Sequence, residues 1–462
     1  MAGAEDVEFA GAAAQASLVS SGELSARELV EMALRRVHAC EPRLRACTTM
    51  LDDAMAQAED ADRRRSNGST APLLGVPVVV KDNVDVAGTV TSHGTSAVTK
   101  RARADCEAVA RLRAAGAVVV AKTTLPELAA FTHFTSSRTF GTTRNPWDLE
   151  RSPGGSSGGS AAPVAAGCVG AALASDGGGS IRVPAACCGL MGLKPERGRV
   201  PLSPHHEHWY GLGVLGPLAH RASDLALMMD ALTSPSEGDV SSRYRDAQRR
   251  APARLRIAYS LRPAVPTAVS DDVAGAVTAT AALLERLGHH VEEQDPDYGD
   301  VRAVAVPRYL RGIAADRALL DEPARLERRT ESLIRLGRLI SRRRLARARA
   351  RAASLARNIN TIFRRYDVLV TPVIARPAPR SDDWARRGAI ANLTGGAPWI
   401  AFTQVWNVTG QPALSLPAGF DEDGMPLAVQ LVGPPDAEPV LIGLAAQLEQ
   451  ARPWADRRPR LG

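Results

Sequence analysis

The stretch SPGGSSGGSAAPVAAGCVGAALASDGGGSIRVP, residues 152–184, decides how the rest of the chain is interpreted. It contains two clusters of glycine and serine, joined by small apolar residues from Ala161 to Ala174. A flexible linker has no need of such a joining segment, whereas a core helix of small residues packs closely against its neighbours. We therefore expect the two clusters to belong to a packed domain and not to a linker.

Glycine-rich loops often bind phosphate, but this one lacks the residues that phosphate binding needs. A P-loop carries a lysine directly after its last glycine, and here Ser160 is followed by alanines. A dinucleotide-binding loop follows a strand, and RNPWDLERSP, residues 144–153, does not have a strand pattern. We therefore expect no nucleotide and no other cofactor.

The second cluster places Gly177, Gly178 and Gly179 directly before Ser180. Acyl transfer creates a negatively charged oxygen in its transition state, and well-placed backbone N–H groups stabilise that oxygen. Turning several consecutive N–H groups toward one point needs backbone angles that glycine adopts without a Cβ penalty. The pattern predicts that Ser180 is a nucleophile and that the N–H groups of residues 177–180 form an oxyanion hole.

A serine nucleophile needs a base, and none of the nine histidines lies in a GxSxG context. The cluster HHEH, residues 205–208, follows Pro204, and no second motif of metal-ligand spacing accompanies it, so we expect no metal. GVPVVVKDN, residues 75–83, has the pattern of a buried strand that ends at Lys81. Burial would lower the pKa of Lys81 and make it a base, although a lysine at a strand end is more often exposed.

Taken together, these motifs resemble those of the amidase signature family of Ser–cis-Ser–Lys hydrolases. The strongest matches are PVVVKDN (77–83), SPGGSSGGSAA (152–162) and SDGGGSIRVPAACCGLMGLKP (175–195). Weaker matches are TRNPWD (143–148), GVLGPLAH (213–220), YDVLVTP (366–372) and NVTGQPALSLPAG (407–419). The resemblance covers about Ser25 to Pro453 and is densest from residue 75 to residue 225.

The resemblance implies a catalytic role for three side chains. Ser180 matches the nucleophile that forms the acyl-enzyme. Ser156 matches the serine that follows a cis peptide bond and passes protons. Lys81 matches the neutral lysine that accepts the proton of that serine, and the backbone N–H groups of residues 177–180 match the oxyanion hole.

Three further residues of the loop can be compared with the family. Asp176 and Arg182 match it, and we expect them to brace the loop, although a purely structural ion pair would fit the sequence equally well. Gly177 departs from the family, which most often has threonine or another residue with a side chain there. We expect the missing side chain to loosen the loop while activity survives, because the N–H group remains.

The reaction implied is hydrolysis of a carboxylic amide to an acid and an amine or ammonia. The A subunit of the glutamine-dependent tRNA amidotransferase is an alternative, disfavoured because an FDGVRYG-like stretch is absent before the basic helix. A non-catalytic protein on the same fold is disfavoured because Lys81 and both serines are present. The sequence does not indicate the substrate. Phe134, Trp209 and Tyr210 either line an acyl pocket or belong to the core.

Elsewhere, strand-like apolar runs alternate with helical segments. The runs are residues 75–83, 116–123, 255–260, 366–372, 412–418 and 427–433. Residues 25–28 form a capping box that begins a helix. The alternation predicts an α/β fold with a mixed, mostly parallel sheet covered by helices on both faces. The family resemblance implies that this sheet is single and large and that residues 1–462 form one domain. Within it we expect a signature core at about 75–225 and a polar surface crossover at about 235–254.

The charge and the cysteines limit the partners. The net charge is +7, and much of it lies in RRRLARARARAASLARNINTIFRR, residues 342–365, where apolar residues repeat every three or four positions. This pattern favours a helix with a solvated arginine face, and an anion or RNA patch is the alternative. The six cysteines form no CxxC pair, so we expect thiols. We expect a cytoplasmic enzyme that takes a small-molecule amide and binds neither nucleic acid nor membrane. Homodimers are common in the family that it resembles.

Overall fold

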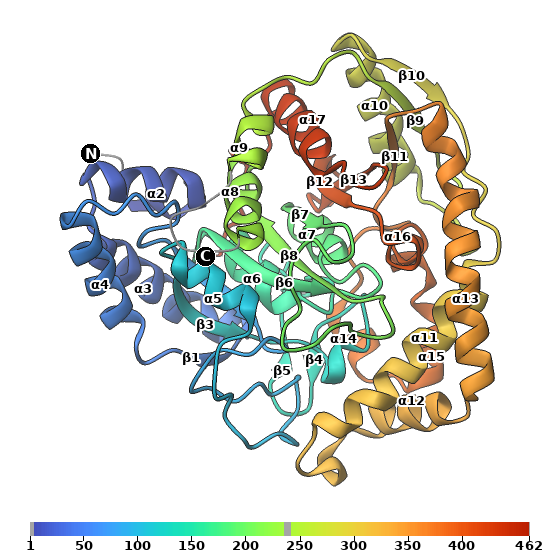
Figure 1. Cartoon of the computed structure of the whole chain (residues 1–462), viewed down its shortest axis with the longest axis horizontal. Coiled ribbons are helices and arrows are strands. Elements are labelled where there is room, and N and C mark those ends of the chain that lie inside the picture. The colour runs from blue at the N-terminus through green and yellow to red at the C-terminus, as the bar shows by residue number, and fades with distance from the viewer. Residues whose placement is uncertain (1–3, 235–241, 462) are drawn as a thin grey trace.

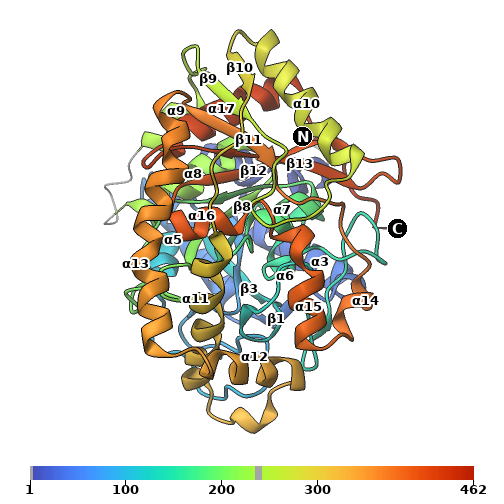
Figure 2. The ribbon, with the colours of Figure 1, turned by 90° about the vertical axis from the view of Figure 1, so that its right-hand side faces the viewer.

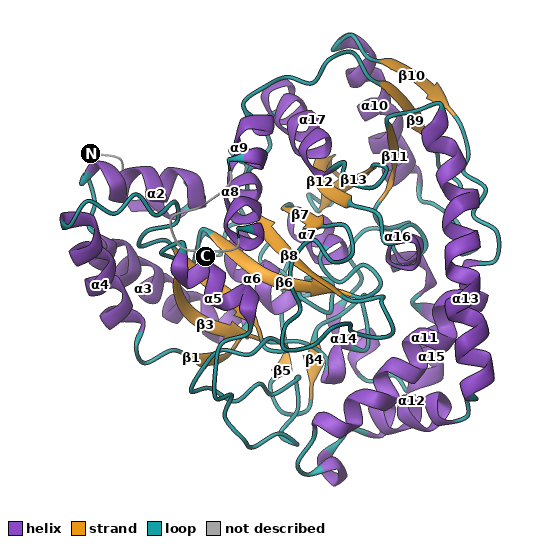
Figure 3. Ribbon diagram, in the orientation of Figure 1, coloured by secondary structure: helices purple, strands orange, loops and turns teal. Residues whose placement is uncertain are grey.

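One large sheet runs through the molecule and takes strands from both halves of the chain (Figures 1 and 3). The structure, a computed structural model, describes residues 4–234 and 242–461. The 11 strands of the sheet are β1 Cys47–Met50, β2 Pro77–Lys81, β3 Val118–Thr123, β6 Ala171–Asp176, β7 Met191–Lys194, β8 Val214–Ala219, β9 Arg256–Tyr259, β10 His290–Glu293, β11 Val368–Pro372, β12 Ala413–Phe420 and β13 Pro426–Val432. Their order across the sheet is β1-β3-β2-β6-β8-β7-β12-β13-β11-β9-β10. A separate pair consists of β4 Ser136–Ser137 and β5 Gly141–Thr142.

The sheet is mixed, as the sequence predicts, and its parallel pairs form two groups. Strand β2 is parallel to β3 and β6, and β9 is parallel to β10 and β11. Antiparallel pairs join the strands from β6 through β8, β7, β12 and β13 to β11, and also join β1 to β3. All six runs that the sequence singles out as strands contain one.

Helices cover both faces because neighbouring residues of a strand point to opposite sides. In β2, Val78 and Val80 join one apolar core, whereas Val79 joins the other. The first core includes residues of α2 Ala12–Ser21, α5 Glu107–Ala114, α8 Ala222–Thr233, α10 Asp271–Arg286 and α17 Glu438–Ala451. The second includes residues of α3 Ala26–Leu44, α4 Ala54–Ser66, α6 Gly158–Ala165 and α7 Arg182–Cys188. Strands buried on both sides read as continuous apolar runs, which is why the sequence reveals them.

A third group of helices packs over the far end of the sheet. It consists of α11 Val301–Asp316, α12 Arg328–Arg338, α13 Arg342–Ile359 and α16 Gln404–Thr409. Helix α13 follows the outer edge of the molecule in Figure 1. Ala348, Leu355 and Ile359 of α13 are buried and its arginines are exposed, so the apolar stripe lies where the sequence predicts. The remaining helical segments are α1 Ala4–Glu8, α9 Arg243–Gln248, α14 Ser381–Ala385, α15 Ala389–Gly395, η1 Glu127–Ala129, η2 Arg317–Leu319, η3 Pro323–Arg325, η4 Asn360–Arg364 and η5 Ala397–Trp399.

Two segments differ from what their composition suggests. The small residues from Ala161 to Ala174 do not form one core helix, because α6 ends at Ala165 and Gly167 follows with a φ of 71°, a left-handed angle that stops a helix. Of the expected crossover, residues 235–241 lie outside the described part of the chain. The remainder includes α9, which buries Tyr244 and whose first backbone N–H groups bond to Asp230.

Other features follow the sequence. The Ser25 capping box is present at the start of α3. All six cysteines are free thiols, and five of them are buried. Among residues 4–234 and 242–461, we find no helix with the length and apolar character needed to cross a bilayer.

Candidate active site

Lys81 is the last residue of β2 and is completely buried. Its Nζ atom lies 2.7 Å from Ser156 Oγ and 3.0 Å from Ser175 Oγ, within hydrogen-bond distance of both. Burial lowers the pKa of Lys81 to about 7, against the opposing effect of the Asp176 charge. A lysine with this pKa is partly uncharged at neutral pH and can accept a proton from a hydroxyl group.

Ser156 stands between the first glycine-rich loop and α6. The Gly155–Ser156 peptide bond is cis, as the family resemblance implies. Gly155 is confined by the backbone of Phe134, because a Cβ atom at residue 155 would lie 2.9 Å from the Phe134 carbonyl carbon. The loop thus approaches its neighbour as closely as only glycine allows, and Ser156 is held against Lys81.

Ser180 lies across a small cavity from Ser156, and we call this cavity the central void. The central void has a volume of about 10 Å³. Its lining residues are Ala129, Ser156, Ser175, Asp176, Gly177, Ser180, His208, Trp209 and Gly213. Within the described residues, no hydrogen bond joins the two serine hydroxyls. Catalytic hydrogen bonds are often long before substrate binds, so the missing bond is compatible with proton transfer between the two serines.

The three glycines before Ser180 do not have equivalent roles. The N–H group of Gly179 donates to Asp176 Oδ1 at 2.6 Å, which differs from the expectation that it points at the oxyanion. The N–H groups of Gly177, Gly178 and Ser180 have no acceptor in the described part of the chain. Gly179 has a φ of 129°, which a residue with a side chain rarely adopts. Three of the four N–H groups of residues 177–180 thus have no acceptor within the described residues, and the fourth, that of Gly179, fixes the loop to Asp176.

Asp176 and Arg182 form a fully buried ion pair that supports this loop. Arg182 Nε donates to Asp176 Oδ2 and Nη2 donates to Asp176 Oδ1, both at 3.0 Å, and the Ile181 N–H group donates to Oδ2 at 3.1 Å. Burial by itself would raise the pKa of Asp176, but the Arg182 guanidinium and several hydrogen bonds outweigh it and hold that pKa well below its ordinary value. The pair is therefore both structural and a brace for the loop.

Sequence reasoning missed the partners that complete this brace. Arg182 also donates to Asn407 Oδ1 and Gln430 Oε1, each at 2.7 Å, and to the Thr403 carbonyl at 3.0 Å. Asn407 Nδ2 donates to Asp176 Oδ1 at 2.8 Å. Asn407 belongs to one of the weaker family matches, which was the only signal that could have found it.

The sequence analysis also gave no role to Ser175 and Asn83. Ser175 Oγ lies 3.0 Å from both Lys81 Nζ and Asn83 Nδ2, so it is a second hydroxyl next to the candidate base. Both residues lie inside the strongest motifs, directly beside Asp176 and two residues after Lys81. Their position in those motifs was the available signal.

Two large cavities share lining residues with the central void, and Trp209 lines all three. The first, of about 440 Å³, is lined by Ser180 and Gly178, and we call it the Ser180 cavity. Helices α11 and α15 contribute to its wall, and Figure 2 shows them at a similar height, α11 to the left of α15. The second, of about 450 Å³, is lined by His93 and Ser175, and we call it the His93 cavity.

The aromatic candidates from the sequence have three different positions. Trp209 lines both large cavities, and Tyr210 lines only the His93 cavity. Phe134 is fully buried in the core and lines neither. Several polar residues that the sequence did not point out also line the Ser180 cavity, among them Gln404 and Arg302, and Arg302 is the one arginine or lysine among its described lining residues.

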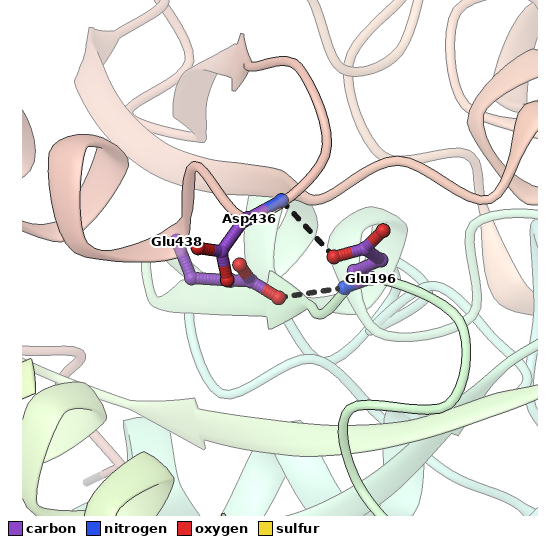
Figure 4. Close-up of side chains that lie close together, drawn as sticks. All are labelled: Glu196, Asp436 and Glu438. Carbon is purple, nitrogen blue, oxygen red and sulfur yellow. Dashed lines mark hydrogen bonds between the residues drawn. The ribbon is translucent and has the colours of Figure 1, made fainter.

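The three histidines of the HHEH cluster, residues 205–208, differ in their surroundings. His208 Nε2 lies 3.3 Å from Asp316 Oδ2, while His205 and His206 are exposed. Elsewhere in the described residues, one group of carboxylates has ligand spacing, and it consists of Glu196, Asp436 and Glu438 (Figure 4).

Figure 4 shows that this carboxylate group is tied together by backbone hydrogen bonds. Arg199 forms ion pairs with Glu196 at 3.0 Å and with Glu438 at 3.3 Å, and it also contacts Asp436. Arg243 lies 2.8 Å from Asp436. Two arginines therefore supply the positive charge that these carboxylates face, and the group is an ion-pair network between the β7 end and the start of α17.

Comparison with known proteins agrees with this geometry. The model of the family described as Amidase matches residues 28–442. The chain is 48% identical over 460 residues to the Mycobacterium tuberculosis (strain ATCC 25618 / H37Rv) protein named "Putative amidase AmiB2", and the match covers 98% of each. Among solved structures, it is similar to a 6-aminohexanoate cyclic dimer hydrolase in complex with substrate (TM-score 0.89, 32% identity, 98% of this chain and 99% of that chain). It is also similar to a peptide amidase from Stenotrophomonas maltophilia (TM-score 0.83, 27% identity, 97% and 98%).

Proposed function

The chain belongs to the amidase family, and on this premise we propose that it hydrolyses a carboxylic amide through an acyl-enzyme formed on Ser180. The observation that carries the proposal is the 2.7 Å contact between the buried Lys81 amine and Ser156 Oγ, beside a void that Ser180 also lines. A buried amine of lowered pKa next to one serine, with a second serine across the void, suits proton transfer away from a nucleophile.

In the first half of the reaction, Ser180 Oγ attacks the carbonyl carbon of the amide. Its proton passes to Ser156 as Ser156 gives its own proton to neutral Lys81. Negative charge develops on the carbonyl oxygen, and the N–H groups of Gly177, Gly178 and Ser180 are available to stabilise it. A donor of this kind typically contributes about 3 kcal/mol to the transition state.

The C–N bond then breaks, and the departing nitrogen takes a proton from Ser156, which recovers one from the Lys81 ammonium. This leaves an ester between the acyl group and Ser180. A water molecule attacks that ester and gives a proton to Ser156 as Ser156 passes its own proton to neutral Lys81. When the bond between the acyl carbon and Ser180 Oγ breaks, Ser156 gives a proton to Ser180 Oγ and recovers one from Lys81, which releases the carboxylic acid and restores all three side chains. The net reaction consumes one amide and one water and yields one acid and one amine or ammonia.

The names of the similar structures support an amide substrate. One similar structure is named as a hydrolase of a cyclic dimer of 6-aminohexanoate, and the other is named as a peptide amidase. Both names are consistent with cleavage of an amide bond. Hydrolysis by the purified chain without any partner would separate this function from that of an amidotransferase subunit, which passes ammonia to another protein.

The test compares Ser180→Ala with a matched serine elsewhere. Ser415 is also buried, and its Oγ atom has no hydrogen-bond partner within the described residues, so Ser415→Ala changes little. We expect Ser180→Ala to lower kcat for a panel of aliphatic and aromatic amides by roughly 10⁴-fold or more, because the acyl-enzyme cannot form. Retention of a tenth of the activity in Ser180→Ala would contradict the acyl-enzyme.

A further inference from the structure

Trp209 is the one described residue that lines both large cavities, the Ser180 cavity and the His93 cavity, and it also lines the central void. Ser180 faces the first, Ser175 faces the second, and only the central void is lined by both Ser156 and Ser180. The position of the Trp209 side chain therefore limits the size of the substrate group that fits in the central void beside Ser156.

The indole ring of Trp209 is held on both of its sides by glycines. A Cβ atom at Gly177 would lie 2.7 Å from Trp209 Cε3, and one at Gly312 would lie 2.5 Å from Trp209 Cδ1. Both distances are shorter than carbon atoms tolerate, so the ring fills the space that a side chain would take at either position. The glycine at position 177 thus makes room for the indole ring.

Polar and aromatic contacts fix the ring in this place. Trp209 Nε1 donates to Asp316 Oδ2 at 2.6 Å. His208 stacks on the indole with 5.0 Å between ring centroids, and Tyr309 meets it edge-on at 5.3 Å. Trp209 is only 6% exposed. If the indole ring swung aside, it would lose this partly buried hydrogen bond and both aromatic contacts, so these contacts hold the ring in place.

The central void beside Ser156 has little free space of its own, and it shares lining residues with both large cavities. The central void has a volume of about 10 Å³, and a cavity needs about 10–15 Å³ to hold one water molecule. An amino group has about the size of a water molecule, whereas an alkyl or aryl substituent on nitrogen is several times larger. The Ser180 cavity, at about 440 Å³, has room for an acyl group of considerable size.

We propose that Trp209 restricts this amidase to primary carboxamides, with the acyl group in the Ser180 cavity and the departing NH₂ group in the central void. The inference rests on the proposed function. In the reaction, the C–N bond of R–CO–NH₂ breaks, Ser156 supplies the proton that turns the leaving group into ammonia, and water supplies the oxygen of the acid. An N-alkyl group would have to occupy the volume of the indole ring.

The wild-type enzyme provides the first test. Hexanamide and N-propylhexanamide have the same acyl group and release the same acid, so hexanoate formation measures both. We expect kcat/KM to be at least thirtyfold higher for hexanamide, and a smaller ratio would overturn the inference. Ser180→Ala must abolish both activities. If neither amide were cleaved, or Ser180→Ala remained active, the proposed function itself would fail.

Variants of Trp209 provide the second test. Trp209→Ala joins the central void to the His93 cavity, so we expect the ratio to fall at least tenfold through a higher kcat/KM for N-propylhexanamide. Trp209→Phe keeps an aromatic ring and replaces the alanine variant in the test if that variant does not fold. In Trp209→Phe we expect the ratio of kcat/KM for the two amides to fall by a smaller factor. Labelling of Ser180 by a fluorophosphonate reports that each variant is folded. Folded variants that kept the wild-type ratio would overturn the role of Trp209.

Trp454 offers a matched control. It is 8% exposed, and its Nε1 donates to the His220 carbonyl at 3.2 Å, so it resembles Trp209 in burial and in bonding. It lines neither the central void nor the two large cavities. Trp454→Ala is expected to lower stability without changing the ratio of the two substrates. A change of the ratio in this variant as large as in Trp209→Ala would assign the effect to general loosening and overturn the inference.

Discussion

Lys81 owes its basicity to where β2 places it. Burial lowers the pKa of Lys81 to about 7, and the charge of Asp176 acts in the opposite direction. The neutral form that accepts protons therefore dominates above pH 7 and disappears below it. We expect kcat/KM to reach a plateau above this pKa and to fall about tenfold for each pH unit below it. A pH–rate profile of the purified enzyme measures this.

Two variants assign that pH dependence to one residue. Lys81→Ala should lose roughly 10²- to 10⁴-fold in kcat/KM and should no longer show the decline near pH 7. Lys194 is a demanding control because burial, followed by the charge of Arg182, lowers its pKa to about 7 as well. In Lys194→Met, kcat/KM should still decline below about pH 7. If the decline vanished in Lys194→Met and persisted in Lys81→Ala, Lys194 would be the titrating group.

At the scale of elements, the loop of residues 176–182 depends on α16, which is more than 200 residues away in the chain. The Asn407 side chain donates to the Asp176 carboxylate and to two carbonyl groups, and accepts from Arg182. Asn407→Ala leaves buried polar groups without partners, at about 1–3 kcal/mol for each group. We expect a lower free energy of unfolding and a lower kcat, because the N–H groups before Ser180 lose their fixed direction.

An asparagine on the solvent side of α13 provides the comparison. Asn358 is exposed, so Asn358→Ala should change the free energy of unfolding by no more than about 0.5 kcal/mol. Urea unfolding of both variants, together with kcat for one amide, measures the difference. An Asn407→Ala enzyme with wild-type stability and wild-type kcat would show that the loop does not need this brace.

The same elements mark how far sequence reasoning reaches. Lys81, Ser156, Ser180, Asp176 and Arg182 could be predicted because each lies in a local motif. The acceptors of Arg182 on α16 and β13 could not, because they depend on which strands and helices become neighbours. The joining segment from Ala161 to Ala174 contains the end of α6 and the start of β6, and its composition does not reveal this division because small apolar residues suit a buried helix and a buried strand equally well.

At the scale of the molecule, strands were predictable and their order was not. Six apolar runs indicated strands because both faces of the sheet are covered, and a strand that is buried on both faces consists of consecutive apolar residues. The antiparallel pairing from β6 to β11 could not be predicted from local sequence, because the pairing of β7 with β12, for example, joins residues that are more than 200 positions apart. The family resemblance, and not the local pattern, carried the expectation of one sheet.

The whole-molecule arrangement also separates chemistry from substrate selection. The proposed catalytic groups all lie between residues 81 and 180, whereas much of the wall of the Ser180 cavity comes from α11 and from residues 392–404. Val306 of α11 lines this cavity and is 38% exposed, so a larger side chain there narrows the cavity without entering the core.

Val306→Trp should therefore lower kcat/KM for decanamide at least tenfold more than for acetamide, while fluorophosphonate labelling of Ser180 continues. Val440 of α17 is 37% exposed and lines neither the Ser180 cavity nor the central void, which makes Val440→Trp the matched control with an unchanged ratio. Equal losses for both amides in Val306→Trp would mean that the acyl group lies elsewhere. A selective loss for decanamide would instead place its chain against α11, and acyl-chain preference could then be altered on α11 without touching the residues that break the bond.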